Sequence, residues 1–233
     1  MSDSAALQGG VWVVVPAYNE GRAISDTLAS VAGMRYRIVV VDDGSADDTA
    51  QRAHSAGATV LRHSCNLGQG AALQTGISYA LRQPDTEYVV TFDADGQHDA
   101  ADIPRMLAPL IDGACDVTLA SRFAPGSVAR DIPAEKKLLL RLAIALARAT
   151  TGLALTDTHN GLRAFTAAAA RQLSISQNRM AHASEILSQI AALKLRYREV
   201  PATVHYTEYS RSKGQPLSNS LNILWEILMA RIR

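Results

Sequence analysis

The first half of the chain alternates short apolar runs, rich in β-branched residues, with segments of helical periodicity. Helical segments are expected at residues 20–32, at 70–82 and from residue 102, and another, capped by Ser45 or Asp47, ends at Gly57. The runs that we predict to be strands cover residues 11–15, 37–41, 59–61, 88–92 and 117–120. Such alternation is typical of a parallel sheet with helices on both faces. We therefore predict an α/β fold with a mostly parallel, Rossmann-like sheet.

Beyond residue 120 the alternation is less regular. We predict helices at residues 134–149, 183–195 and 217–231, a strand at 160–165 and an extended segment at 197–207. Neither an internal repeat nor a low-complexity linker divides the sequence. We therefore expect a single domain over residues 1–233, in which a C-terminal elaboration follows the sheet.

The sequence lacks the marks of a secreted or membrane-spanning protein. Cys65 and Cys115 have no partner spacing, so neither a disulfide framework nor a zinc site is indicated. The N-terminal residues do not resemble a signal peptide. No uncharged apolar run approaches the ~18 to 20 residues that a spanning helix needs. We expect a cytoplasmic protein, and the sequence does not indicate an oligomeric state.

The net charge of +1 hides a strong asymmetry between the two halves. Residues 1–120 hold 7 basic and 15 acidic residues, whereas residues 121–233 hold 16 and 7. A basic half of this size favours an anionic ligand or surface. The basic residues are scattered and no nucleic-acid motif accompanies them, so we expect phosphorylated substrates or anionic lipid headgroups rather than nucleic acid.

Carboxylates follow two of the predicted strands. Asp42 and Asp43 come after the second strand, and Asp93 and Asp95 after the fourth. In open α/β sheets, ligands bind at the carboxyl ends of the strands. We therefore expect these four side chains to lie at the ligand-binding edge.

The stretch from residue 92 to residue 98 has the chemistry of a metal site. Side chains two apart in extended backbone point the same way, so Asp93, Asp95 and Gln97 can aim at one point. Their oxygens would form a partial shell for Mg²⁺ or Mn²⁺, which phosphate oxygens could complete. Taken alone, the stretch also fits an ordinary acidic turn. An EF-hand is excluded, because His98 and Pro104 stand where that loop needs Gly and Glu.

Two common nucleotide-binding motifs are absent. Gly68 and Gly70 open a helix, but Leu73 stands where a dinucleotide fingerprint requires its third glycine. None of the lysines follows a glycine-rich loop, which excludes a Walker A motif. The two glycines could contact phosphate or only permit a tight entry into the helix.

Four short motifs together resemble a known family. Val14–Glu20, Val39–Ser45, Asn66–Gly70 and Asp93–His98 are similar, in this order, to the signature of family 2 glycosyltransferases with a GT-A fold. Within that family the chain most resembles the dolichyl-phosphate mannose synthase and polyprenyl-phosphate glycosyltransferase branch. Further segments match that branch at Ser121–Phe123, Asp157–Arg163 and Glu185.

The resemblance implies roles for individual residues. The nucleotide would contact Pro16, Ala17, Tyr18, Glu20, Asp42, Asp43, Gly68, Gly70 and Asp93. Asp93, Asp95 and Gln97 would hold Mg²⁺ or Mn²⁺ against the diphosphate, which makes the nucleoside diphosphate a better leaving group. The nucleotide half would span residues 1–120 and the acceptor half residues 121–233.

Basic side chains of the second half are candidates for binding phosphate. Arg122 directly follows a predicted strand, and Arg163 is similarly placed, although it could instead pair with Asp157. Arg211 and Lys213 lie in a cationic loop. Many relatives carry a Ser-Lys pair after the glycine of this loop, whereas here Lys213 precedes the glycine, so its role departs from the family pattern.

We take Asp95, Arg122 and Glu185 as the catalytic candidates. A hydroxyl acceptor would require a general base, which Glu185 could supply. A phosphate acceptor needs no base, and Glu185 could then serve a structural role.

The predicted helix 134–149 bears on membrane contact. Lys137, Arg141 and Arg148 fall in one stripe, with leucines over most of the remaining surface. This pattern suits a helix at a membrane interface, and it equally suits a core helix with snorkelling basic chains. We expect any membrane contact to be peripheral.

These observations favour an inverting, metal-dependent transfer of a sugar from a nucleotide-diphosphate sugar to a polyprenyl phosphate, an activity implied by the resemblance. One alternative keeps the fold but uses a saccharide hydroxyl as acceptor. Another is a catalytically silent module that binds nucleotide or lipid.

Overall fold

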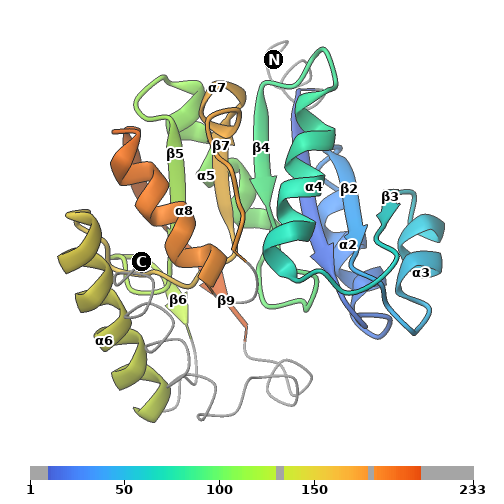
Figure 1. Cartoon of the computed structure of the whole chain (residues 1–233), viewed down its shortest axis with the longest axis horizontal. Helices are drawn as coiled ribbons and strands as arrows, with labels where there is room; N and C mark the ends of the chain where they lie inside the picture. Colours follow the sequence, from blue (N-terminus) through green and yellow to red (C-terminus); the bar gives the residue numbers. More distant parts are fainter. Residues whose placement is uncertain (1–9, 130–133, 178–180, 206–233) are drawn as a thin grey trace.

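A seven-stranded mixed sheet forms the centre of the molecule. The computed structural model describes residues 10–129, 134–177 and 181–205. The strand order is β3-β2-β1-β4-β7-β5-β8 (Figure 1). The bounds are β1 (Val11–Ala17), β2 (Arg37–Asp42), β3 (Thr59–Arg62), β4 (Tyr88–Thr91), β5 (Val117–Ser121), β7 (Arg163–Thr166) and β8 (Tyr197–Pro201). Only β7 runs antiparallel to its neighbours in this sheet, so the prediction of a mostly parallel sheet is confirmed.

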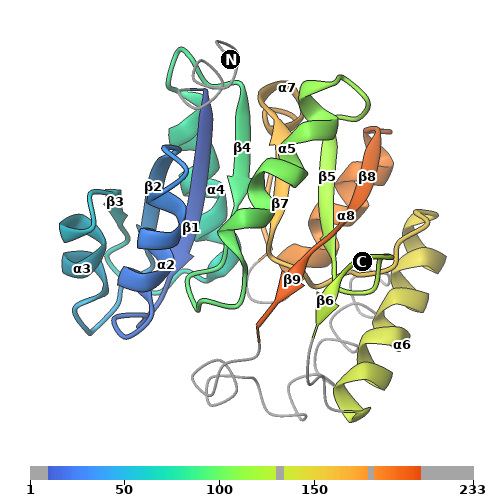
Figure 2. The same ribbon diagram turned by 180° about the vertical axis from the view of Figure 1, so that it is seen from behind.

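Helices cover both faces of the sheet, as predicted. One face carries α2 (Ile24–Ala32), α3 (Thr49–Ser55), η1 (Ala100–Asp102) and α5 (Ile103–Ile111) (Figure 2). The opposite face carries α4 (Gln69–Leu81), α7 (Ala167–Ala170) and α8 (Ala181–Ala192). Along the outer side of α8 lies α6 (Ala134–Thr151), and a small second sheet pairs β6 (Val128–Ala129) with β9 (Thr203–Val204). The predicted helix 217–231 lies outside the described residues.

Alternate side chains of β1 enter two separate cores. Val13 and Val15 pack with Leu28 of α2, whereas Trp12 and Val14 pack on the α4 side. Each fully buried Val or Leu stabilises the fold by roughly 1.5–3 kcal/mol. Burial on both faces is why the strand is continuously apolar in sequence.

The first strand continues past the point predicted from its proline. The ladder between β1 and β2 includes Pro16 and ends at Ala17, opposite Asp42. The ladder between β1 and β4 has already ended at Val14, opposite Thr91. The backbone nitrogen of Pro16 faces β4 at a point where the β1–β4 ladder has already ended. The N–H that proline lacks is therefore not needed for any hydrogen bond of the sheet.

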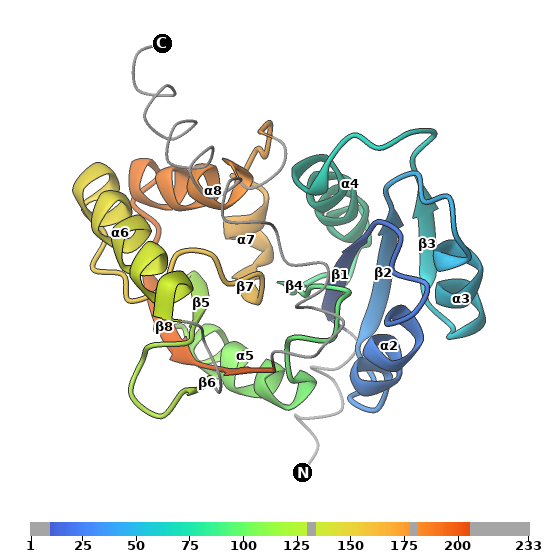
Figure 3. The ribbon, with the colours of Figure 1, turned by 90° about the horizontal axis from the view of Figure 1, so that it is seen from below.

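The ligand-binding edge lies at the carboxyl ends of β1 and β4 (Figure 3, viewed from that edge). The chain proceeds from β1 outward through β2 to β3 and then returns to β4 on the other side of β1. Such a reversal of strand order opens a crevice beyond the strand ends. Because β7 is antiparallel, its first residue, Arg163, lies level with Thr91 at the end of β4.

Candidate active site

Two carboxylates at the end of β2 have different surroundings. Asp42 is fully buried, its Oδ1 accepts from Ser45 N at 3.0 Å, and its Oδ2 lies 3.0 Å from Arg62 Nε. Asp43 accepts backbone hydrogen bonds from Leu67 at 2.9 Å and Gly68 at 2.7 Å, one on each oxygen. Asp43 therefore holds the loop that opens α4.

His63 and Thr75 extend this network, although no motif in the sequence indicates either residue. His63 Nδ1 lies 2.7 Å from Asp43 Oδ1, and its Nε2 lies 3.0 Å from Thr75 Oγ1 on α4. A carboxylate has about four lone-pair positions. Three of the lone-pair positions on Asp43 are occupied by contacts with His63, Leu67 and Gly68, so Asp43 mainly positions the loop before α4.

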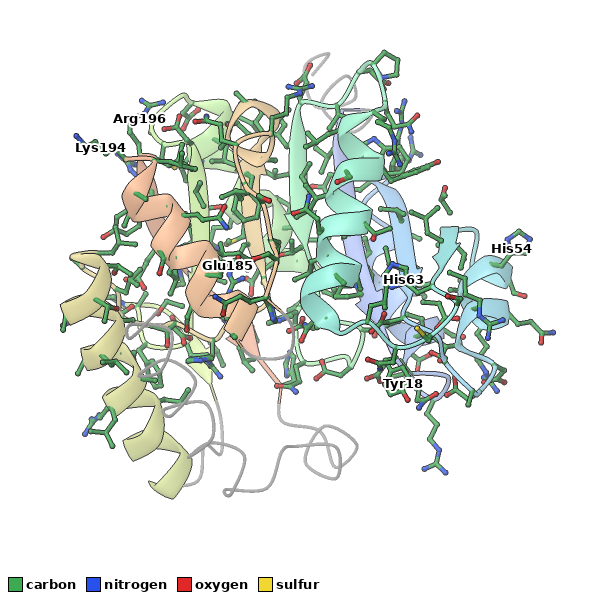
Figure 4. The ribbon with its side chains drawn as sticks, viewed as in Figure 1. Tyr18, His54, His63, Glu185, Lys194 and Arg196 are labelled. Carbon is green, nitrogen blue, oxygen red and sulfur yellow. The ribbon has the colours of Figure 1, made fainter. Side chains whose placement is uncertain are left out.

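The loop after β1 is fixed to the start of α3. Asn19 has φ +53° and donates its N–H to Ser45 Oγ at 2.9 Å, while Glu20 N donates to Thr49 Oγ1 at 2.8 Å. Tyr18 is 45 % exposed and lies at the lower, carboxyl edge of the sheet, beneath His63 (Figure 4). The N-cap of α3 is Asp48, which makes no side-chain cap hydrogen bond, so the predicted cap at Ser45 or Asp47 is wrong. Asp47 Oδ1 instead accepts from Thr49 N at 3.1 Å, and Ser45 Oγ binds the loop after β1.

The two glycines at the start of α4 have conformational and packing roles. Gly68 has φ +97°, a conformation that side chains rarely adopt. A Cβ at Gly70 would stand 2.0 Å from the carbonyl oxygen of Gln177. Between them, Gln69 Nε2 donates to Asp93 Oδ1 at 3.2 Å. The tight entry into α4 thus brings an amide to the predicted metal site.

Asp93 lies among positive and hydrogen-bonding groups. Its Oδ2 is 3.0 Å from Nε2 of the buried His98. Burial alone would raise the pKa of Asp93, but the His98 hydrogen bond and the charges of His98, Arg163 and His182 outweigh it and lower the pKa. Asp93 is therefore ionised at neutral pH.

Asp95 has the opposite shift. Burial and the charge of Asp93 raise its pKa above the ordinary value. The backbone N–H of Gln97 donates to Asp95 Oδ1 at 3.1 Å, and its side-chain Nε2 donates to Oδ2. From behind, Thr27 Oγ1 on α2 donates to the Ala94 carbonyl at 3.0 Å and holds the loop in place.

The donor set fits a small divalent cation. Both carboxylates are partly exposed, and their mutual repulsion is what a cation between them would relieve. Among the described residues, the Gln97 amide oxygen accepts no hydrogen bond. No cluster of three or more His, Cys, Asp or Glu suited to a metal occurs in the described part of the chain. The remaining coordination positions would fall to substrate and water oxygens.

Asp157 forms an ion pair with Arg122 and not with Arg163, for which the sequence had offered it as a possible partner. Arg122 Nε and Nη2 donate to the two carboxylate oxygens at 2.7 and 2.8 Å, and its backbone N–H donates at 3.0 Å. Both side chains are buried. Glu199 Oε1 on β8 accepts from the backbone of Thr156 and Asp157, at 2.7 and 3.1 Å, and fixes this carboxylate in turn.

The segment before β7 packs directly on the loop of residues 93–97, which carries the predicted metal ligands and is called the metal loop below. A Cβ at Gly161 would stand 2.0 Å from Asp93 Oδ2, and the Gly161 carbonyl accepts from Thr91 Oγ1 at 2.7 Å. Arg163 is 3 % exposed at the start of β7. His159 is partly buried with its Nε2 inaccessible, and desolvation of the ring together with the charge of Arg122 lowers its pKa to about 4.

Glu185 belongs to a loop contact. Its carboxylate accepts from Ser176 Oγ at 2.6 Å, from Ser176 N at 3.0 Å and from Gln177 N at 2.9 Å. Figure 4 shows Glu185 on the lower part of α8, toward α4. Because Gln177 rests on Gly70, Glu185 supports the start of α4.

Arg211 and Lys213 lie outside the described residues. The last described residues contact the metal loop and the residue that follows it. His205 N donates to the Gln97 carbonyl at 2.9 Å, and Val204 forms an antiparallel bridge with His98.

One side of α6 is exposed. Arg141, Leu142 and Arg148 face outward and Leu140 is buried, whereas the side chain of Lys137 lies outside the described residues. In the described parts of the chain, no helix combines the length and apolar character needed to cross a bilayer.

Comparison with known proteins gives related enzymes. Residues 12–174 match the family described as "Glycosyl transferase family 2". A dolichyl-phosphate N-acetylglucosaminyltransferase of Methanococcus voltae is 29% identical, over 95% of this chain and 96% of its own length. An undecaprenyl-phosphate mannosyltransferase of Micrococcus luteus is also 29% identical, over 95% and 98%. An uncharacterized protein of Methanocaldococcus jannaschii is 35% identical, over 95% and 92%.

Solved structures show the same fold. Glucosyl-3-phosphoglycerate synthase from Mycobacterium tuberculosis, in complex with Mn²⁺, UDP and glucosyl-3-phosphoglycerate, superimposes with a TM-score of 0.71. Its sequence is 20% identical, and the match covers 98% of this chain and 82% of that one. The predicted GT-A architecture is confirmed. The chain belongs to glycosyltransferase family 2 and is a glycosyltransferase.

Proposed function

We propose that the protein transfers a sugar from a nucleotide-diphosphate sugar to a polyprenyl phosphate, with inversion at the anomeric carbon. The observation that carries the proposal is the pair Asp93 and Asp95, two carboxylates brought together at the strand-order reversal beside buried arginines. Relatives that use dolichyl and undecaprenyl phosphate support the acceptor class.

Asp93, Asp95 and Gln97 would hold Mg²⁺ or Mn²⁺. When bound, the ion neutralises charge on the diphosphate and so favours its departure. Asp93 is kept ionised by His98 and Arg163, and Thr27 fixes the loop backbone. Pro16, Ala17, Tyr18, Glu20, Asp42 and Asp43 would surround the nucleoside, together with Gly68 and Gly70 at the start of α4.

The acceptor phosphate would enter from the basic half of the chain, where Arg122, Arg163, Arg211 and Lys213 are the candidates to bind it. A phosphate monoester is already a nucleophile at neutral pH, so this reaction needs no base. The contacts of Glu185 with Ser176 and Gln177 agree with a supporting role. The exposed side of α6 would allow peripheral contact with the cytoplasmic face of a membrane.

The experiment is a transfer assay with labelled nucleotide sugars, undecaprenyl or dolichyl phosphate, and Mn²⁺. Label should pass into the organic phase with wild-type protein and stay in the aqueous phase with Asp95→Ala. Transfer to a soluble saccharide instead would identify a hydroxyl acceptor. Absence of both transfer and donor hydrolysis would indicate a silent binding module and overturn the proposal.

A further inference from the structure

Arg163 is a buried arginine that forms no ion pair within the described chain, unlike the other arginines that are buried or close to a carboxylate. Arginines paired with a carboxylate are Arg37, Arg52, Arg62, Arg105, Arg122 and Arg196. Arg163 is 3 % exposed, yet within the described residues its guanidinium has neither a hydrogen bond nor an ion pair. It is therefore a buried cation without a direct partner.

The two carboxylates whose charges reach Arg163 are already engaged. They are Asp93 and Asp157. Asp93 takes hydrogen bonds from Gln69 and His98 on its two oxygens. Both oxygens of Asp157 take hydrogen bonds from Arg122. The donors of Arg163 thus remain available to a ligand.

Keeping this cation buried has a cost. Burial lowers the pKa of Arg163 to about 10, so the side chain still carries its charge at neutral pH. A buried charge without a hydrogen-bonded partner destabilises a fold, and apolar replacements of such groups are often neutral or stabilising. A bound anion would remove the penalty.

Two nitrogen atoms near Arg163 also lack hydrogen-bond partners in the described chain. In the turn that leads to Arg163, His159 Nε2 and Asn160 Nδ2 are buried, and neither has a hydrogen-bond partner in the described chain. With the Arg163 guanidinium, the Asn160 amide gives the turn a surplus of N–H donors near Asp93, and His159 Nε2 adds another in the tautomer whose Nδ1 accepts from Thr158 Oγ1. Such a surplus suits phosphoryl oxygens, which are multiple acceptors.

We infer that Arg163 directly binds a phosphoryl group next to the metal loop, whereas Arg122 is a positioning residue that acts through Asp157. This inference rests on the proposed function and divides the roles of its arginines. The shared chemistry is a phosphate dianion or diphosphate, which could belong to the acceptor or to the donor.

The first test compares the melting temperatures of Arg163→Met and Arg122→Met without ligand. Arg163→Met should melt at the wild-type temperature or a few degrees above it, because it removes an unpaired buried charge. Arg122→Met should melt several degrees lower, because it leaves the buried carboxylate of Asp157 without its ion-pair partner. A loss of stability, or failure to fold, in Arg163→Met would show that the arginine is a structural partner and would overturn the inference.

The second test uses binding. Farnesyl phosphate serves as a soluble polyprenyl phosphate, and UDP and GDP with Mn²⁺ represent the donor. If Arg163 receives the acceptor, Arg163→Met should weaken farnesyl phosphate at least tenfold and weaken the nucleotides with Mn²⁺ clearly less, through the lost positive charge near Asp93. If Arg163 receives the donor, the nucleotides should lose more affinity than farnesyl phosphate. Arg163→Lys, which keeps the charge but not the fork of donors, should lose less. Unchanged affinity for both ligands would overturn the inference.

The two proposals fail in distinguishable ways. If wild-type protein binds no nucleoside diphosphate with Mn²⁺ and transfers no sugar, the proposed function fails, whatever the melting temperatures of the variants. If wild-type protein does both and Arg163→Met retains both affinities, only the role of Arg163 fails.

Discussion

Asp93 and Asp95 lie two residues apart in one loop and have pKa values shifted in opposite directions. His98 and the nearby positive charges lower that of Asp93, while burial and the charge of Asp93 raise that of Asp95. Two carboxylates so arranged form an electrostatically strained pair that a divalent cation would stabilise. Several measurable consequences arise from this pair and from the groups that hold it.

Gly161→Ala should impair metal-dependent binding. Its new Cβ would overlap the carboxylate of Asp93, which would have to move. Displacing a metal-supporting group typically costs about 10- to 100-fold in affinity. Titration of Mn²⁺ with a nucleoside diphosphate would measure the loss. Gly33→Ala, at a helical glycine with no close neighbour, is the matched control and should bind as wild type.

Glu185→Gln separates a supporting carboxylate from a general base. An amide oxygen can still accept hydrogen bonds from Ser176 and Gln177, so we expect kcat for transfer to stay within about threefold of wild type. Loss of a general base would lower kcat by about 10²- to 10⁴-fold. Such a loss, with normal folding, would favour the hydroxyl-acceptor alternative.

Asp157→Asn should destabilise the fold by about 3–5 kcal/mol, because it leaves the charge of the buried Arg122 uncompensated. Urea unfolding at pH 7 measures the change. Asp116→Asn, which breaks an ion pair with the largely exposed Arg196, should cost less than about 1 kcal/mol. Equal effects of the two substitutions would contradict the assignment of Asp157 as the buried anchor.

His159 should make stability depend on pH. Its pKa is about 4 in the folded protein and about 6.5 when unfolded, so below pH 6.5 the unfolded chain binds the proton more readily. Stability is full above about pH 6.5 and is lost as the pH falls toward 4, by on the order of 3 kcal/mol from this residue. Urea unfolding at pH 7 and 4.5 should show a smaller loss for His159→Gln than for wild type. His54→Gln, at an exposed position on α3, should behave as wild type.

The sequence predicts the strands and acidic edge of this fold because their signals are local. Apolar runs identify β1, β2 and β4, and the parallel arrangement then places Asp42, Asp43, Asp93 and Asp95 at one edge. The antiparallel insertion of β7 between β4 and β5 had no local signal, because strand order depends on long-range pairing.

Side-chain partners were also beyond local inference. The sequence leaves Asp157 as an alternative partner of Arg163, yet Asp157 pairs with Arg122, the residue that follows β5. The contact of Asp43 with His63 joins residues from two strand ends and likewise has no signature in spacing. Such pairings follow from tertiary packing.

The most direct measurement is a thermal-shift panel of nucleoside diphosphates, with and without Mn²⁺, on wild-type protein and Asp95→Ala. Ligand that binds only the folded state raises the melting temperature according to its affinity and concentration. We predict a rise for at least one diphosphate that requires Mn²⁺ and disappears in Asp95→Ala. A metal-independent rise, no rise with any diphosphate, or a rise that Asp95→Ala retains would contradict a metal–diphosphate centre at Asp93 and Asp95.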